Sequence, residues 1–89
     1  MTPRQSEIVN IIGNYIIDHG YSPTASDIAE RAGIATNRAW QHMKRLREMG
    51  IISYDRTGRT ARITGNWTVR QGKVYREVLN ISELNKNSA

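Results

Sequence analysis

The sequence contains no cysteine and only two histidines among its 89 residues. Without cysteine the chain can form no disulfide, no thiolate metal site and no thiol nucleophile. His19 and His42 are too far apart along the chain to act as a ligand pair on one helix. We therefore expect no metal, no cofactor and no catalytic activity.

Long apolar runs are also missing. No run approaches the roughly 20 residues needed to cross a bilayer, and the N-terminus lacks the charged start and apolar segment of a secretory signal. We expect a cytoplasmic protein that does not enter a membrane. A chain of 89 residues makes one small domain, with little stability left over for a deep pocket, so no small-molecule substrate is expected.

Positive charge is abundant but unevenly distributed. Residues 36–76 hold ten of the thirteen Lys and Arg residues and two of the eight acids, which gives +8, while the whole chain carries +5. Such clustering is typical of a surface that contacts phosphates. The alternative is a solvated basic face that serves only solubility.

The N-terminal third of the chain has strong helix signals. Thr2 and Pro3 have the form of an N-cap followed by proline at the first helical position. Apolar residues then recur every three or four positions as far as residue 19, and Gly20 ends the helix. Gly13, inside this helix, costs roughly 1 kcal/mol relative to alanine, and we expect a neighbouring helix to approach closely there.

Two further helices should follow. Thr24 caps a short helix that ends at Gly33. A third helix is predicted at about 36–49, with Thr36 or Asn37 as its N-cap and a buried stripe. A short helix, a glycine turn and a basic helix make up a helix-turn-helix. The expected buried stripe of the third helix is Ala39, Met43, Leu46 and Met49.

The segment after the third helix distinguishes between varieties of that motif. Residues 51–54 and 61–64 are short β-prone runs, separated by a polar loop at 55–60 that contains glycine. The sequence thus predicts an α+β fold, a winged helix-turn-helix with three helices followed by a β-hairpin wing. We expect this domain to occupy residues 1–65 and a C-terminal extension to occupy residues 66–89.

Four stretches carry a resemblance to a known family. These are the Thr-Pro-Arg-Gln-Ser-Glu at 2–7, the His-Gly-Tyr-Ser-Pro-Thr at 19–24, the Asp-Ile-Ala-Glu-Arg-Ala-Gly at 27–33 and the run from His-Met-Lys-Arg-Leu at 42–46 to Ile52. In order and near-spacing they resemble the N-terminal DNA-binding domain of the LexA repressor family over residues 2–64.

The resemblance implies a winged-helix DNA binder. It has two departures: the stretch between Gly33 and His42 is one residue shorter than in the family, and nothing in the sequence corresponds to the family's C-terminal peptidase domain. Self-cleavage and a response to DNA damage are therefore not implied.

Residues that would touch DNA follow from the helix geometry and from this resemblance. The first turns of a recognition helix face base edges in the major groove. The planar fork of Arg38 suits guanine. Trp40 could contact thymine methyls, cover the edge of the core or pack under the C-terminal extension. The predicted base-reading residues are Asn37, Arg38, Trp40 and Gln41. The predicted phosphate contacts are Thr24, Thr36, Lys44 and Arg45, while Arg47 could equally be a solvated charge.

The wing carries its own candidates. Arg56, Thr57 and Arg59 lie in the 55–60 loop, and Arg62 follows on the second strand. Arginines at a loop tip suit the DNA backbone or a narrow minor groove. The alternative is an ordinary exposed turn, and we favour DNA contact because the arginines cluster beside the recognition helix.

The extension is less constrained by its sequence. Residues 67–78 could form a second hairpin around 70–73, or a helix could begin near Val78. The segment could serve for homodimerisation, or it could pack back on its own domain with a disordered end at 85–89.

Two functions remain open at this point. The first is a transcriptional regulator, acting as a repressor, that binds double-stranded DNA with sequence specificity. The second is a winged-helix adaptor that contacts an acidic protein in a transcription or replication complex. Polar residues at the start of the third helix favour DNA, because the centre of a protein-binding face is more often apolar.

Overall fold

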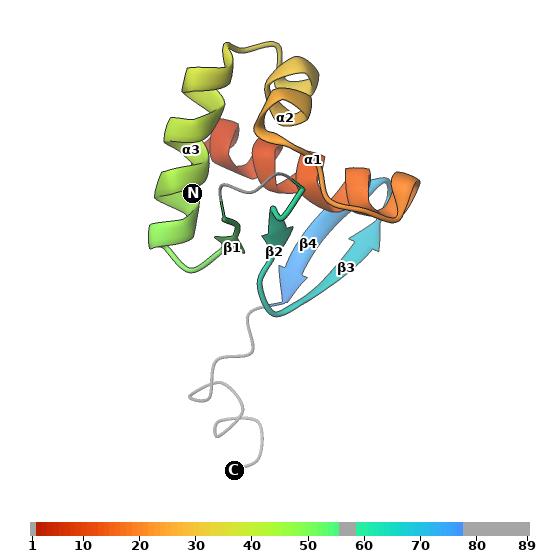
Figure 1. The fold of residues 1–89 in the computed structure, drawn as a ribbon. Helices are drawn as coiled ribbons and strands as arrows, with labels where there is room; N and C mark the ends of the chain where they lie inside the picture. Colours follow the sequence, from red (N-terminus) through yellow and green to blue (C-terminus); the bar gives the residue numbers. More distant parts are fainter. Residues whose placement is uncertain (1, 56–58, 78–89) are drawn as a thin grey trace.

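The computed structural model describes residues 2–55 and 59–77. Three helices, α1 (Pro3–His19), α2 (Ala25–Ala32) and α3 (Thr36–Glu48), are followed by four strands. The strands form two separate antiparallel hairpins, and both lie on the same side of the helices in Figure 1. The prediction of three helices followed by a hairpin is confirmed.

Helices α1 and α2 begin at the caps that the sequence indicates. The Thr2 hydroxyl accepts from the Gln5 backbone N–H at 3.2 Å, and the Gln5 side chain accepts from the Thr2 N–H at 3.0 Å. Thr24 and Asp27 form the same reciprocal pair at the start of α2. Each of these reciprocal pairs is a capping box, which satisfies two backbone N–H donors that the helix itself leaves unpaired.

Helix α3 differs from the prediction at both ends. Its N-cap is Ala35, which is already extended (φ −68°, ψ 150°) and makes no side-chain cap hydrogen bond, so the predicted cap at Thr36 or Asn37 is wrong. Thr36 is instead the first helical residue. At the other end Met49 is the C-cap and is 42% exposed, so it does not extend the buried stripe.

One hydrophobic core joins the three helices to the first hairpin. Strands β1 (Ile52–Ser53) and β2 (Arg62–Ile63) pair antiparallel, with Ile52 opposite Ile63. Both isoleucines point into the core, while Ser53 and Arg62 lie on the other face, as the two-residue period of a strand requires. The largest fully buried side chains are Ile8, Ile12, Ile28, Met43, Leu46, Ile52 and Pro23.

The second hairpin is β3 (Asn66–Arg70) paired with β4 (Lys73–Glu77), so the hairpin interpretation of the extension is confirmed for these residues. Its turn uses positive φ at Gln71 and Gly72. The predicted helix near Val78 and the predicted disordered end at 85–89 lie outside the described residues.

This hairpin packs against α1 of its own chain. Val74 is 4% exposed, and its backbone N–H donates to the Asn10 side chain at 2.9 Å. A Cβ built on Gly13 would lie 2.6 Å from Val74 Cγ1. The close neighbour at Gly13 is therefore strand β4, and the prediction of a neighbouring helix there is wrong.

Candidate nucleic-acid interface

Helix α3 has one buried and one solvent-exposed face. Ala39, Met43 and Leu46 are at most 1% exposed and pack against α1, α2 and the first hairpin. The other face is polar and basic. Its exposed residues are Thr36, Asn37, Arg38, Gln41, Lys44, Arg45 and Glu48.

Three of the four predicted base-reading residues share that exposed face. Asn37, Arg38 and Gln41 lie in the first two turns of α3. Gln41 follows Asn37 by four residues and Arg38 by three, so it neighbours both of them on the helix surface. The guanidinium of Arg38 is a planar group of hydrogen-bond donors, and the side-chain amides of Asn37 and Gln41 each carry a donor and an acceptor. The face can therefore offer directed hydrogen bonds to planar polar edges.

Trp40 occupies a different position. It is half-buried against the core, and the centroid of its ring lies 5.5 Å from the centroid of the Tyr54 ring. Tyr54 also holds Arg47, whose guanidinium carbon lies 4.3 Å from the Tyr54 ring centroid. Trp40 thus packs at the edge of the core, as one of its three interpretations predicted, and Tyr54 is a supporting residue that the sequence did not reveal.

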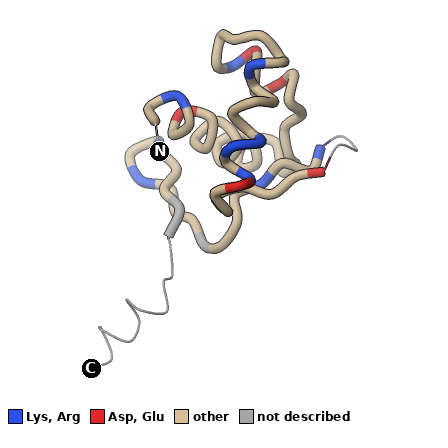
Figure 2. The backbone as a smooth tube through the Cα atoms, turned by 90° about the vertical axis from the view of Figure 1, so that its left-hand side faces the viewer, with Lys and Arg blue, Asp and Glu red and all other residues tan. Residues whose placement is uncertain are grey.

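The predicted phosphate contacts fall at two helix starts and along α3. Thr24 is the N-cap of α2, and Thr36 opens α3. Lys44 and Arg45 are exposed further along α3. Arg45 Nη1 lies 3.7 Å from Glu48 Oε2. Such a loose ion pair on the surface contributes little to stability. In Figure 2, which views the molecule from the α3 side, basic and acidic positions are interspersed along the backbone.

The wing is described in part. Arg56 and Thr57 lie outside the described residues. At the base of the loop, the Thr60 hydroxyl accepts from the Asp55 N–H at 2.8 Å and donates to the Asp55 carbonyl at 2.9 Å. Arg62 is exposed on β2 and reaches the Ser53 hydroxyl across the strand pair at 3.4 Å.

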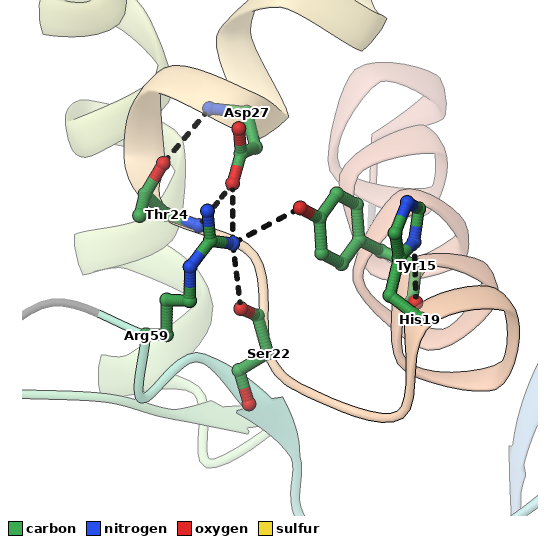
Figure 3. Close-up of polar contacts among 6 residues, drawn as sticks. All are labelled: Tyr15, His19, Ser22, Thr24, Asp27 and Arg59. Carbon is green, nitrogen blue, oxygen red and sulfur yellow. Dashed lines mark hydrogen bonds and ion pairs between the residues drawn. The ribbon is translucent and has the colours of Figure 1, made fainter.

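Arg59 is held by the helices. Its Nη1 atom lies 2.9 Å from Asp27 Oδ2, 3.0 Å from the Tyr15 hydroxyl and 3.3 Å from the Ser22 carbonyl (Figure 3). The pKa of Asp27 is lowered by the Thr24 backbone N–H and, to a smaller extent, by Arg59. The pKa of Arg59 is raised, chiefly by its bond to Tyr15. The predicted DNA contact by Arg59 therefore competes with three partners inside the protein.

These partners were not predicted from the sequence. In the sequence, Asp27 stands three residues after the Thr24 cap and Tyr15 lies within the apolar repeat of α1, and neither position indicates a contact with the wing. No local pattern connects position 59 with positions 15 and 27, because the contact depends on how the wing folds back over α1 and α2.

Comparison with known proteins identifies the family of this fold. The sequence profile described as "LexA DNA binding domain" matches residues 1–62, which is most of the chain and covers all three helices and the first strand pair up to Arg62. The chain belongs to the LexA DNA-binding domain family. The resemblance noted in the sequence is thereby confirmed, and so is the winged helix-turn-helix fold.

Curated relatives share the LexA name. A LexA repressor of Pseudomonas aeruginosa is 42% identical over 53 residues, which is 58% of this chain and 26% of the relative. LexA repressors of Shewanella frigidimarina and Shewanella loihica are each 43% identical, with the same coverage. The chain spans about a quarter of the length of these LexA repressors. Strands β3 and β4 lie beyond the residues that the LexA profile matches.

Within residues 2–55 and 59–77, no helix combines the length and the apolar character that crossing a bilayer requires.

Proposed function

We propose that this chain is a sequence-specific regulator of transcription that binds double-stranded DNA and acts as a repressor. The observation that supports this function best is the polar face formed by Asn37, Arg38 and Gln41. It is exposed in the first two turns of α3, while the opposite stripe of the same helix is buried. A helix held in this way can enter the major groove, which is wide enough to admit it.

The side chains on this face match the chemistry of base edges. Arg38 can donate two parallel hydrogen bonds to O6 and N7 of guanine. Asn37 and Gln41 can each pair an amide donor and acceptor with N6 and N7 of adenine. Trp40 packs against Tyr54, so in this proposal it supports the reading face and contributes at most its outer edge to a thymine methyl.

Phosphate contacts would fix the register of α3 on the duplex. Lys44 and Arg45 lie on the exposed side of α3, and Thr24 and Thr36 lie at the starts of α2 and α3, where the helix dipole favours an anion. Arg56, Thr57 and Arg62 of the wing would approach the backbone or the minor groove. Binding should therefore weaken steeply as salt rises.

Repression follows from occupancy: a domain bound across a promoter blocks access to it. The relatives that share this domain are named repressors, which supports repression over activation. We further propose that two copies bind a two-fold site, since symmetric half-sites match a symmetric pair of recognition helices.

Selection from a random double-stranded DNA library tests the function. We expect an enriched consensus. Arg38→Ala should weaken binding to that consensus by about 1–3 kcal/mol and relax the preference at one base pair. Lys44→Ala is the matched control: it should weaken binding on all sequences alike and reduce the slope of log K against log salt by about 0.9. An unchanged base preference in Arg38→Ala would refute the assigned reading face, and the absence of any enrichment would favour the protein-adaptor function.

The two-fold arrangement has its own test. A palindromic consensus, together with a 2:1 protein-to-duplex complex in sedimentation, would support it. A consensus with one half-site and a 1:1 complex would contradict it while leaving the DNA-binding function in place.

A further inference from the structure

Arg59 joins the wing to three separate parts of the helical unit. Its Nη1 atom contacts Tyr15 on α1, the Ser22 carbonyl in the link between α1 and α2, and Asp27 on α2. The guanidinium carbon also lies 4.8 Å from the Tyr21 ring centroid. Figure 3 shows the Tyr15 hydroxyl, the Ser22 carbonyl and the Asp27 carboxylate converging on the guanidinium. We call Arg59, Tyr15, Ser22 and Asp27 the Arg59 clasp.

The wing needs such an anchor because its own pairing is short. Strands β1 and β2 contribute two residues each, and an isolated two-stranded hairpin is marginally stable in water at best. Ile52 and Ile63 bury the base of the hairpin in the core. The bonds between Asp55 and Thr60 stay within the wing. Among the described residues, the clasp supplies the polar contacts that tie the loop end of the wing to α1 and α2.

The clasp also engages the start of α2. Asp27 Oδ2, which accepts from Arg59, accepts from the Thr24 N–H at 3.0 Å as well. The Thr24 hydroxyl in turn accepts from the Asp27 N–H at 3.1 Å. One carboxylate therefore caps α2 and fixes the wing, so the wing is oriented relative to the helix that precedes α3.

We propose that Arg59 is a positioning residue that sets the wing for DNA binding through Asp27 and Tyr15, and that it is not itself a phosphate contact. The inference rests on the proposed DNA-binding function and replaces one role within it. An arginine paired with a carboxylate has much of its charge compensated nearby, so it attracts a phosphate less strongly than Arg62, which donates to the neutral Ser53 hydroxyl.

Asp27→Asn separates the two roles by the sign of its effect on affinity. If Arg59 contacted phosphate, removing the Asp27 charge would release the guanidinium and leave binding unchanged or tighter. If Arg59 positions the wing, the same variant weakens binding, and we expect a loss of about three- to ten-fold. The asparagine oxygen can still accept from the Thr24 N–H, so the cap of α2 is kept.

Glu30→Gln is the matched control. It removes one negative charge from α2 at an exposed position, and it should leave affinity unchanged or slightly higher. Affinities of all variants are compared well below their unfolding temperatures, which are recorded by circular dichroism.

A double-mutant cycle with Arg59→Gln supplies the second criterion. Residues that act through each other give a double variant that binds about as well as the weaker single variant, whereas independent contributions add. Equal losses in Asp27→Asn, Arg59→Gln and the double variant are expected. Additive losses, or tighter binding by Asp27→Asn, would overturn the clasp.

Footprinting and hydrogen exchange complete the design. In Asp27→Asn, protection of guanine N7 from methylation in the major groove should persist, while hydroxyl-radical protection at the flank contacted by the wing should fall.

Amide exchange of residues 59–63 in the free protein should accelerate in Asp27→Asn and not in Glu30→Gln. Equal exchange in both variants would refute the clasp even without DNA. A wild-type chain that binds no DNA would refute the proposed function and leave the exchange result to decide the clasp.

Discussion

Gly13 shows how one residue records a contact that is distant in the sequence. It lies within α1, where glycine is an unfavourable helix residue, and it faces strand β4 at the far end of the described chain. A Cβ at this position would lie 2.6 Å and 2.8 Å from the two Val74 methyls and 3.0 Å from Ile63 Cδ1. The absence of a side chain at Gly13 is what allows Val74 to pack directly on α1.

Gly13→Ala should destabilise the protein by roughly 1 kcal/mol. The gain in helix propensity is about 1 kcal/mol, but overpacking against the buried Val74 costs about 1–3 kcal/mol. In a Val74→Ala background the two nearest atoms are removed and the end of the Ile63 side chain can shift into the vacated space, so the same Gly13→Ala change should stabilise. Urea unfolding of the four proteins measures both effects. Stabilisation by Gly13→Ala in the wild-type background would show that β4 does not approach this closely.

At the scale of a single element, α3 has an incomplete N-terminus. Helices α1 and α2 both begin with a capping box, whereas Ala35 gives α3 no side-chain acceptor. Its first turn also carries no acidic residue. A DNA-reading helix gains from this arrangement, because N–H groups that are not used by a cap can meet a phosphate and no carboxylate repels it.

Substitutions at Ala35 test whether stability and DNA binding are opposed at this helix end. Ala35 has the extended backbone of an N-cap, so Ala35→Ser and Ala35→Asp should each stabilise the protein by about 0.5–2 kcal/mol. Ala35→Asp should also weaken DNA binding several-fold at low salt, since it places a negative charge beside the phosphates. Ala35→Ser is the neutral control and should bind more tightly than Ala35→Asp. Thermal unfolding and fluorescence anisotropy supply the two measurements, and equal affinities would place the start of α3 away from the duplex.

At the scale of the whole molecule, local signals predicted most of the architecture. Caps at Thr2 and Thr24 and the apolar period located α1 and α2, because both signals depend on residues within a few positions of each other. The base-reading candidates on α3 were equally accessible, since helix geometry alone separates Arg38 from the buried stripe. The N-cap of α3 was misassigned because two polar residues follow the alanine that takes the cap position itself.

Contacts between distant segments could not be predicted in the same way. The partner of Gly13 lies 61 residues further along, and Arg59 meets Asp27 across 32 residues. Each contact depends on how a hairpin packs on α1 or α2, and no spacing rule encodes that packing. The sequence therefore assigned Arg59 to DNA on the basis of its neighbours in the loop, whereas the fold supplies a carboxylate and a phenol.

The second hairpin should stabilise the domain without altering the base preference proposed for α3. Its strand β4 buries Val74 on α1 and bonds to Asn10, while α3 lies on the opposite side of the molecule in Figure 1. A chain that ends after Gly65 loses these contacts, and we expect its unfolding free energy to fall by about 2–3 kcal/mol, the contribution of a buried valine and one hydrogen bond. A chain that ends after Glu77 keeps both strands and is the control. Selection from the same DNA library, at a temperature where both shortened chains are folded, should return one consensus for both. A different consensus for the chain ending at Gly65 would mean that the hairpin shapes the reading face after all, and equal stabilities would mean that its packing on α1 contributes nothing.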